Sequence, residues 1–259
     1  MRKTMVAVSL VVFLLSVLLA GCMGVVVGSG NVETREMDFS GFSRISAGHR
    51  FEVEIVQSDS YSISITADDN LFEYIQVSKA GETLRIGLKP TVGYASGTLR
   101  AEITMPELYE LDLSGMTHGT IKGFSTSEDF DLELSGASSL NINDMAAGDI
   151  SIELSGASRA SGDITASGDA QFDLSGASKA ELTGSANDIL IEASGASQLS
   201  LDNFPVNNAD VELSGASRAT VNLDGRLDAD LSGASKLSYI GEPIMGDIHT
   251  SGGSTVSKK

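Results

Sequence analysis

Apolar and polar residues alternate in short runs along most of the chain, which is the pattern of β-strands with one buried and one exposed face. In the first part of the chain such runs occupy residues 50–55, 61–65, 83–88 and 99–103. Turn-forming residues separate them. Only residues 68–74 have the composition of a helical turn, with Asp69 or Asn70 as its cap. The pattern predicts an all-β protein.

In the second part of the chain the alternation is tied to a repeated tetrapeptide, Ser-Gly-Ala-Ser. Its full copies begin at Ser135, Ser155, Ser175, Ser194, Ser214 and Ser232, and degenerate copies begin at Ser114 and Ser251. Successive copies are therefore 18 to 21 residues apart. A near-constant period of this length indicates stacked structural repeats.

Aligning the repeats on their first serine reveals columns of apolar residues, one and three positions before it and five and seven positions after it. The column directly before the serine contains Leu113, Leu134, Leu154, Leu174, Ala193, Leu213 and Leu231. One unit of about 20 residues cannot bury such a face alone, whereas stacked units bury it in a continuous interior. Because parallel crossovers are nearly always right-handed, we predict a right-handed parallel β-helix, a β-solenoid, over residues 113–259. A less regular β-rich segment over residues 31–112 precedes it.

The tetrapeptide suits a corner of each coil, because small side chains let successive backbones pass closely and glycine tolerates unusual φ angles. We expect its stacked serines to hydrogen-bond from coil to coil. A serine nucleophile is the rival interpretation, but a catalytic serine is needed only once and requires a histidine partner. The chain has three histidines in unrelated contexts, so no catalytic residue is expected.

The N-terminus has the layout of an export signal, with Arg2 and Lys3, an apolar run over residues 5–19 and small residues before Cys22. The ending Leu-Ala-Gly-Cys resembles the lipobox of prokaryotic lipoproteins, in which the signal is removed before the cysteine and the thiol receives a diacylglycerol. Two acyl chains give stable anchoring. An ordinary secretory peptide with an incidental cysteine is the alternative. A transmembrane helix is disfavoured because the run is shorter than the ~20 residues that a bilayer requires.

These features predict a signal peptide over residues 1–21, a lipidated tether over 22–30 and a β-helical domain over 31–259. Cys22 is the expected lipidation site, and it is the only cysteine, so no intramolecular disulfide can form. The protein is expected to be exported to the cell envelope and anchored to a membrane through its N-terminal lipid.

Acidic residues outnumber basic ones by 35 to 17, and a surface with a formal charge of −18 repels nucleic acid. An outward column of seven carboxylates stands two positions before the repeated serine: Asp112, Glu133, Glu153, Asp173, Glu192, Glu212 and Asp230. Across coils about 4.8 Å apart, neighbouring charges repel by about 0.9 kcal/mol even at the dielectric constant of water. A partly basic column stands four positions after the serine: Arg159, Lys179, Arg218 and Lys236.

Two interpretations of the acidic column stay open. It is either a solvated face, whose repulsion counterions and the four bases relieve, or a surface that binds divalent cations or a polymeric ligand. The glycine-rich nonapeptide of calcium-binding β-rolls is absent, so a calcium cage is not supported. No metal and no cofactor is expected.

Several motifs occur in an order that resembles a known family. They are Gly-Phe-Ser-Arg-Ile-Ser at 41–46, Val-Glu-Ile-Val-Gln-Ser-Asp at 53–59, Ala-Asp-Asp-Asn-Leu at 67–71, Gly-Glu-Thr-Leu-Arg-Ile at 81–86 and the Ser-Gly-Ala-Ser array. Together they resemble the family described as "putative auto-transporter adhesin, head GIN domain", from about Asn31 to the C-terminus. The resemblance implies a β-helical protein that is secreted or lipid-anchored, and it brings no catalytic residues.

The sequence thus favours a non-enzymatic, lipid-anchored cell-surface module for adhesion, envelope structure or binding of a surface protein or glycan. A polysaccharide-acting β-helix enzyme of the lyase or glycosidase type is one alternative, because such enzymes need clustered carboxylates. Their active sites, however, depend on irregular loops, and here the repeats vary little. A sensor domain of an envelope-stress system is the other alternative.

Overall fold

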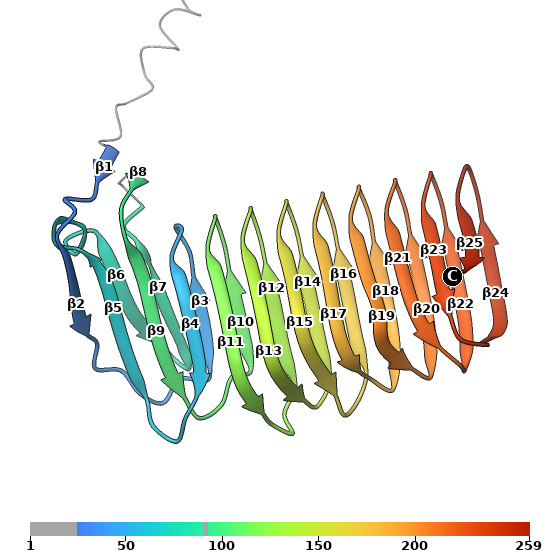
Figure 1. Cartoon of the computed structure of the whole chain (residues 1–259), viewed down its shortest axis with the longest axis horizontal. Helices are drawn as coiled ribbons and strands as arrows, with labels where there is room; N and C mark the ends of the chain where they lie inside the picture. Colours follow the sequence, from blue (N-terminus) through green and yellow to red (C-terminus); the bar gives the residue numbers. More distant parts are fainter. Residues whose placement is uncertain (1–24, 91–92) are drawn as a thin grey trace, which may run out of the picture.

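The computed structural model describes residues 25–90 and 93–259. These residues form an elongated stack of coils, in which each coil contributes one strand to each of two facing sheets (Figure 1). We call the eleven-stranded sheet, with order β24-β22-β20-β18-β16-β14-β12-β10-β3-β7-β6, sheet I. The twelve-stranded sheet, with order β2-β5-β9-β4-β11-β13-β15-β17-β19-β21-β23-β25, is sheet II. The predicted all-β solenoid is confirmed.

The regular coils extend from the pair β10 and β11 to the pair β24 and β25, and every strand pairs in parallel with its equivalents in adjacent coils. In sheet I the strands are β10 (Glu110–Leu113), β12 (Phe130–Leu134), β14 (Ile150–Leu154), β16 (Ala170–Leu174), β18 (Asp188–Ala193), β20 (Asn208–Leu213), β22 (Arg226–Leu231) and β24 (Ile244–Thr250). In sheet II they are β11 (His118–Ser125), β13 (Ser139–Ala147), β15 (Arg159–Ala166), β17 (Lys179–Ser185), β19 (Gln198–Val206), β21 (Arg218–Leu223), β23 (Lys236–Ile240) and β25 (Thr255–Lys258).

The N-terminal end of the stack does not follow the order of the sequence. Its elements are β2 (Val32–Glu36), β3 (Arg44–Ala47), β4 (Glu52–Gln57), β5 (Ser62–Asp68), the 3-10 turn η1 (Asp69–Leu71), β6 (Ile75–Ala80), β7 (Thr83–Leu88) and β9 (Leu99–Met105). Strands β3 and β4 pair in parallel with β10 and β11, while the later strands β7 and β9 pair on their other side. Antiparallel β6, β5 and β2 cover that end.

Strands β3 and β4 therefore add one more parallel coil in front of the regular coils, inside the segment 31–112 that the sequence predicts to be less regular. The turn of this coil, over residues 48–51, is Gly-His-Arg-Phe and lacks the repeated tetrapeptide. The register of β3 with β10 and of β4 with β11 nevertheless aligns this turn with Ser114–Thr117.

The segment predicted as part of a tether is held against the domain. Strand β1 (Val25–Val27) pairs in parallel with β8 (Gly93–Ser96) in a separate two-stranded sheet. The buried Asp68 carboxylate accepts hydrogen bonds from the backbone N–H groups of Gly30 and Thr98, both at 2.6 Å. The side chain of Asn70 donates to the carbonyl of Val27 at 2.9 Å. The predicted signal peptide and Cys22 lie outside the described residues.

The predicted apolar columns form the interior. Leu113, Leu134, Leu154, Leu174, Leu213 and Leu231 are each at most 1% exposed. Alternate residues of each strand point into the space between the sheets, and the aromatic rings of Phe172 and Phe204 meet there edge to face. Among the described residues, no helix has the length and hydropathy needed to cross a bilayer.

The tetrapeptide forms the corner from sheet I to sheet II, as predicted. Its glycine has a φ angle near +70°, for example +71° at Gly156, a conformation that only glycine adopts at low cost. The N–H of Ala157 donates to the carbonyl of Gly136 in the preceding coil at 2.7 Å. A Cβ atom on Gly156 would lie 2.4 Å from that carbonyl oxygen. Both the φ angle and the close approach of successive coils therefore require glycine.

The predicted serine-to-serine ladder is wrong in detail, because the buried hydroxyls bond to backbone carbonyls. The hydroxyl of Ser138 donates to the carbonyl of Ser135 in its own turn at 2.9 Å and of Leu113 in the preceding coil at 3.0 Å. Ser217 repeats this arrangement with Ser214 and Ala193. Within the described part of the chain, the Ser158 hydroxyl has no hydrogen-bond partner. Backbone hydrogen bonds already join the corners of successive coils, so the hydrogen bond of the serine hydroxyl is an additional contact.

Candidate functional site

The outward carboxylate column lies in register along sheet I. Strand pairing places each member directly beside the next: Asp112, Glu133, Glu153, Asp173, Glu192, Glu212, Asp230 and then His249. All are exposed except Asp112, which is partly buried and accepts a hydrogen bond from the Ser46 hydroxyl at 2.8 Å. Because strands in a ladder stand about 4.8 Å apart, the column is a continuous row of negative charge along the molecule.

The basic column four positions after the serine lies on the opposite sheet. Arg159, Lys179, Arg218 and Lys236 begin strands of sheet II, and Lys179 pairs with Glu181 of its own strand at 2.8 Å. Within residues 25–90 and 93–259, no ion pair joins these bases to the carboxylate column of sheet I. If these bases relieve the repulsion within the carboxylate column, they do so without direct ion pairs in the described ranges.

Repulsion within the column is visible in the pKa of Glu133. Although Glu133 is exposed, neighbouring atoms partly desolvate its carboxyl group and raise this pKa, and the charges of Asp112, Glu153 and Glu110 raise it further. The folded state thus binds the proton of Glu133 more tightly than the unfolded state does. Binding of this proton contributes to the free energy of unfolding below the pKa that Glu133 has in the unfolded chain. The contribution is lost as the pH rises through the pKa of Glu133 in the folded state. At neutral pH the ionised Glu133 opposes folding.

A second series of acidic residues borders the same face at the turns that enter sheet I. The Oδ1 atom of Asp129 accepts the backbone N–H of Asp149 at 2.9 Å, and that of Asp149 accepts the N–H of Asp169 at 2.8 Å. Asp188 and Asn208 continue the series in the same way. We call these five residues the Asx ladder. Each side chain replaces a backbone carbonyl as acceptor, so the ladder locks the turns of successive coils together.

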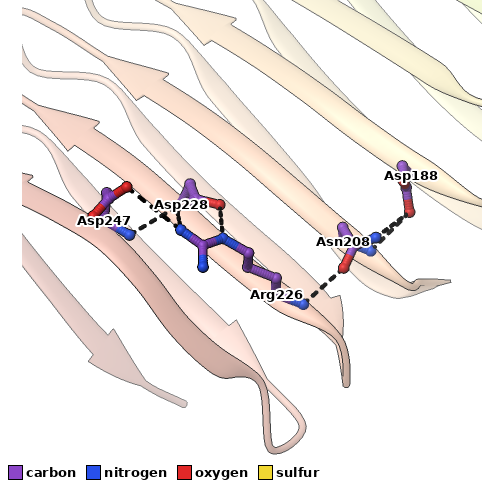
Figure 2. Close-up of polar contacts among 5 residues, drawn as sticks. All are labelled: Asp188, Asn208, Arg226, Asp228 and Asp247. Carbon is purple, nitrogen blue, oxygen red and sulfur yellow. Dashed lines mark hydrogen bonds and ion pairs between the residues drawn. The ribbon is translucent and has the colours of Figure 1, made fainter.

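The Asx ladder ends at an arginine (Figure 2). The Oδ1 atom of Asn208 accepts the N–H of Arg226 at 2.8 Å, and the Arg226 guanidinium binds both carboxylate oxygens of Asp228 at 2.6 and 2.7 Å. This bidentate contact and the backbone N–H of Asp247 lower the pKa of Asp228. The positively charged Arg226 side chain thus follows the last member of the Asx ladder and neutralises Asp228 near the C-terminal end of the stack.

Sequence reasoning did not identify the Asx ladder, although a signal was present. Its members stand six positions before the first serine of five successive repeats. Polar residues near turns are usually solvated, so the column alone does not indicate that each member accepts a backbone N–H, as it does here.

Shallow hollows lie beside the two acidic series. One of about 480 Å³ is bordered by the ladder carboxylates and by Asp131 and Asp210, with Ile150, Ile189 and Leu190 at its base. Another of about 320 Å³ is lined by the column members Asp173, Glu192, Glu212 and Asp230, with serines of the neighbouring corners. The outer face of sheet I therefore combines dense negative charge with places where side chains of another molecule would fit.

The face is not arranged as a cage for a metal ion. In the ranges that the structure describes, no three His, Cys, Asp or Glu side chains converge on a point where they could share a metal. Each ladder aspartate also commits one oxygen to a backbone N–H. Calcium prefers six to eight oxygen ligands, so each ladder aspartate has one oxygen fewer to offer to such an ion.

The fold and this face define a parallel β-solenoid with one strongly acidic side. The model of the family described as "putative auto-transporter adhesin, head GIN domain" matches residues 41–243, and the chain belongs to this family. Membership agrees with the resemblance seen in the motifs, and it indicates an exported or cell-surface protein. None of the curated proteins matches the chain.

Solved structures share the fold. A putative adhesin from Parabacteroides merdae has a TM-score of 0.79 at 18% identity, with 91% of this chain and 99% of that chain covered. A putative lipid binding protein from Parabacteroides distasonis has a TM-score of 0.77 at 20% identity, with the same shares covered. A putative adhesin from Bacteroides fragilis has a TM-score of 0.70 at 20% identity, covering 90% of this chain and all of that one. The family and these structures carry names of adhesins or lipid-binding proteins and not of enzymes.

Proposed function

We propose that the protein is a non-enzymatic, lipid-anchored module of the cell surface that binds a positively charged partner through the outer face of sheet I. The observation that carries this proposal is the in-register row of seven carboxylates, six of them exposed, on one side of a rigid stack. A partner of matching chemistry is a surface protein with a basic patch, because complementary charge steers association and fixes orientation.

The same face argues against catalysis. Two carboxyl groups can act as a general acid and a general base only where their environments drive their pKa values apart. The repeat instead gives successive members of the column, such as Glu153 and Asp173, the same place on equivalent strands. At the corners from sheet I to sheet II, a nearly constant tetrapeptide stands where irregular loops usually carry active sites. The proposal therefore favours binding over a polysaccharide-acting enzyme.

The binding test compares two triple variants of the purified chain on immobilised polylysine. Changing Glu153→Gln, Asp173→Asn and Glu192→Gln together should weaken binding about tenfold, because three favourable charge contacts of about 0.5 kcal/mol each are lost. Added salt should weaken binding of the unchanged chain as well.

The control triple changes Glu102→Gln, Asp163→Asn and Glu181→Gln. These residues lie on β9, β15 and β17 of sheet II, so the control alters net charge equally. It should change binding less than twofold. Equal losses from the two triples would show that net charge, and not the face of sheet I, determines binding.

The anchoring part of the proposal depends on Cys22. In growing cells supplied with labelled palmitate, the unchanged chain should incorporate the label and Cys22→Ser should not, because only the thiol can accept the diacylglycerol. Met23→Ser is the matched control, since it changes the next residue and keeps the thiol, and it should remain labelled. Persistent labelling of Cys22→Ser would show that this residue is not the lipidation site.

A further inference from the structure

The corner of the β3–β4 coil departs from the rule that all later coils follow. Its second residue is His49 with φ +64°, and its third is Arg50 with φ +69°. The register places His49 opposite Gly115, whose φ angle is +74°. Two consecutive non-glycine residues in this region cost conformational free energy, and such strain gathers at functional positions.

The structure gives His49 a local role but leaves Arg50 without one. The Nδ1 atom of His49 accepts the backbone N–H of Leu88 at 3.3 Å and thereby ties the corner to the end of β7. The guanidinium of Arg50 is exposed, and it forms no ion pair within the described ranges. Its neighbour is the ring of Tyr94 on β8, with 6.0 Å between the guanidinium carbon and the ring centroid.

Arg50 lines a pocket of about 470 Å³ together with Tyr94, Ser96, Met116 and His118. Of the residues that the structure describes, no carboxylate lines it. In a chain with a formal charge of −18, this is a local exception. A guanidinium, an imidazole and two hydroxyl groups converge beside a thioether, which suits an anionic group that carries an organic part.

Two side chains of this pocket, those of Tyr94 and His118, are held by hydrogen bonds. The Tyr94 hydroxyl donates to the carbonyl of Gly97 at 2.6 Å, and burial raises its pKa, so it stays protonated and its oxygen can accept a bond. The Nδ1 atom of His118 lies 2.6 Å from the hydroxyl of Ser139, which leaves the Nε2 atom for another contact. A ligand would therefore meet these two groups already in place, which reduces the entropy lost on binding.

The pocket also lies next to the N-terminal strand. Tyr94 and Ser96 belong to β8, which pairs with β1, and β1 begins three residues after Cys22. At ~3.3 Å per residue, three residues can span at most about 10 Å. Val25 and Met116 near this end are 66% and 45% exposed. If Cys22 is acylated, the pocket is held close to the lipid headgroups.

We propose that this pocket binds a phosphate ester, with Arg50 contacting the phosphate and with Tyr94 and Met116 contacting the alcohol part. Arginine matches phosphate oxygens with two parallel N–H donors. The volume exceeds that of an inorganic ion alone and leaves room for a glycerol-sized group. The ester is either the headgroup of an anionic phospholipid or a free phosphate ester. Binding to a phospholipid headgroup depends on the membrane anchoring proposed at Cys22. Binding of a free phosphate ester in the pocket does not depend on it.

The test follows the imidazole signals of the purified full chain in non-ionic detergent, with carbon-labelled histidine. Only His49, His118 and His249 contribute signals, and the first two lie at or beside the pocket. Glycerol 3-phosphate should shift the His118 signal saturably. Arg50→Gln should weaken this binding at least tenfold, while Arg159→Gln, an exposed arginine of sheet II, should leave it within twofold.

Arg50→Gly serves as the second variant, because glycine suits the φ angle at this position and the fold is retained. It should lose binding to the same extent as Arg50→Gln. Vesicles containing phosphatidylglycerol identify the source: a His118 shift with these vesicles supports the lipid headgroup, and a shift with glycerol 3-phosphate alone supports a free ester. No saturable shift with either probe, or equal shifts in both Arg50 variants and the unchanged chain, overturns the proposal.

The outcome is separable from that of the anchoring experiment. Binding of glycerol 3-phosphate requires no acyl chain, so a chain that is not labelled at Cys22 would still bind the ester. Conversely, if the chain is labelled at Cys22 but the His118 signal does not shift, the anchoring proposal stands and the pocket proposal is overturned.

Discussion

Gly156→Ala should destabilise the domain by about 3–5 kcal/mol, because it combines backbone strain of 1–3 kcal/mol with overlap of similar size. Gly156 has φ +71°, and a Cβ atom there would lie 2.4 Å from the carbonyl oxygen of Gly136. That oxygen also accepts the N–H of Ala157 at 2.7 Å. The added methyl group would therefore push two coils apart at a corner where their backbones pack closely. Denaturant unfolding followed by far-ultraviolet circular dichroism measures the loss.

Gly123→Ala is the matched control for this prediction. Gly123 has φ +74°, but no heavy atom lies within 4 Å of the Cβ position. Its substitution should cost only the strain of the φ angle, about 1–2 kcal/mol. The difference between the two variants isolates the close approach of the coils. Similar losses at Gly156 and Gly123 would mean that the corner backbones can separate without cost.

Leu154→Ala should destabilise the domain by about 2–5 kcal/mol, as other truncations of buried leucine do. Leu154 is 0% exposed and lies between Leu134 and Leu174 in the stacked interior. The cavity would adjoin two coils, and neither could close it without disturbing the next. The same unfolding measurement applies.

Glu153→Ala provides the comparison, since Glu153 is adjacent in sequence and exposed on the outer face. It should change the free energy of unfolding by less than about 1 kcal/mol, and relief of charge repulsion should make the change stabilising. If both substitutions destabilised the domain to the same degree, the assignment of inward and outward faces would be wrong.

Sequence reasoning identified the parts of the fold that depend on the period. Leu134 and Leu154 occupy one column because each coil has nearly the same length, and parallel in-register stacking then follows. The corner glycines were identifiable for the same reason. The acidic column was predicted as a row on one face, since outward positions alternate strictly with the leucines.

The parts that it missed depend on contacts between distant segments. Strand β3 pairs with β10 across more than 60 residues, and no motif marks that partnership because the intervening corner contains His49 and Arg50. The attachment of residues 25–30 depends on the buried carboxylate of Asp68, whose burial is a property of the folded state. Composition also cannot show that Asp149 accepts a backbone N–H, because that requires the turn geometry.

The direction of the hydrogen bonds between coils has a mechanical consequence. These bonds run along the long axis of the stack (Figure 1), so a pull along this axis loads them in tension one coil after another. A coil of about 20 residues that detaches would lengthen the chain by roughly 60 Å, because an extended residue spans ~3.3 Å and a stacked coil only ~4.8 Å. If such a molecule were held at its N-terminus and pulled at a bound partner, its coils would detach one at a time. Each detachment would dissipate mechanical work before either attachment broke.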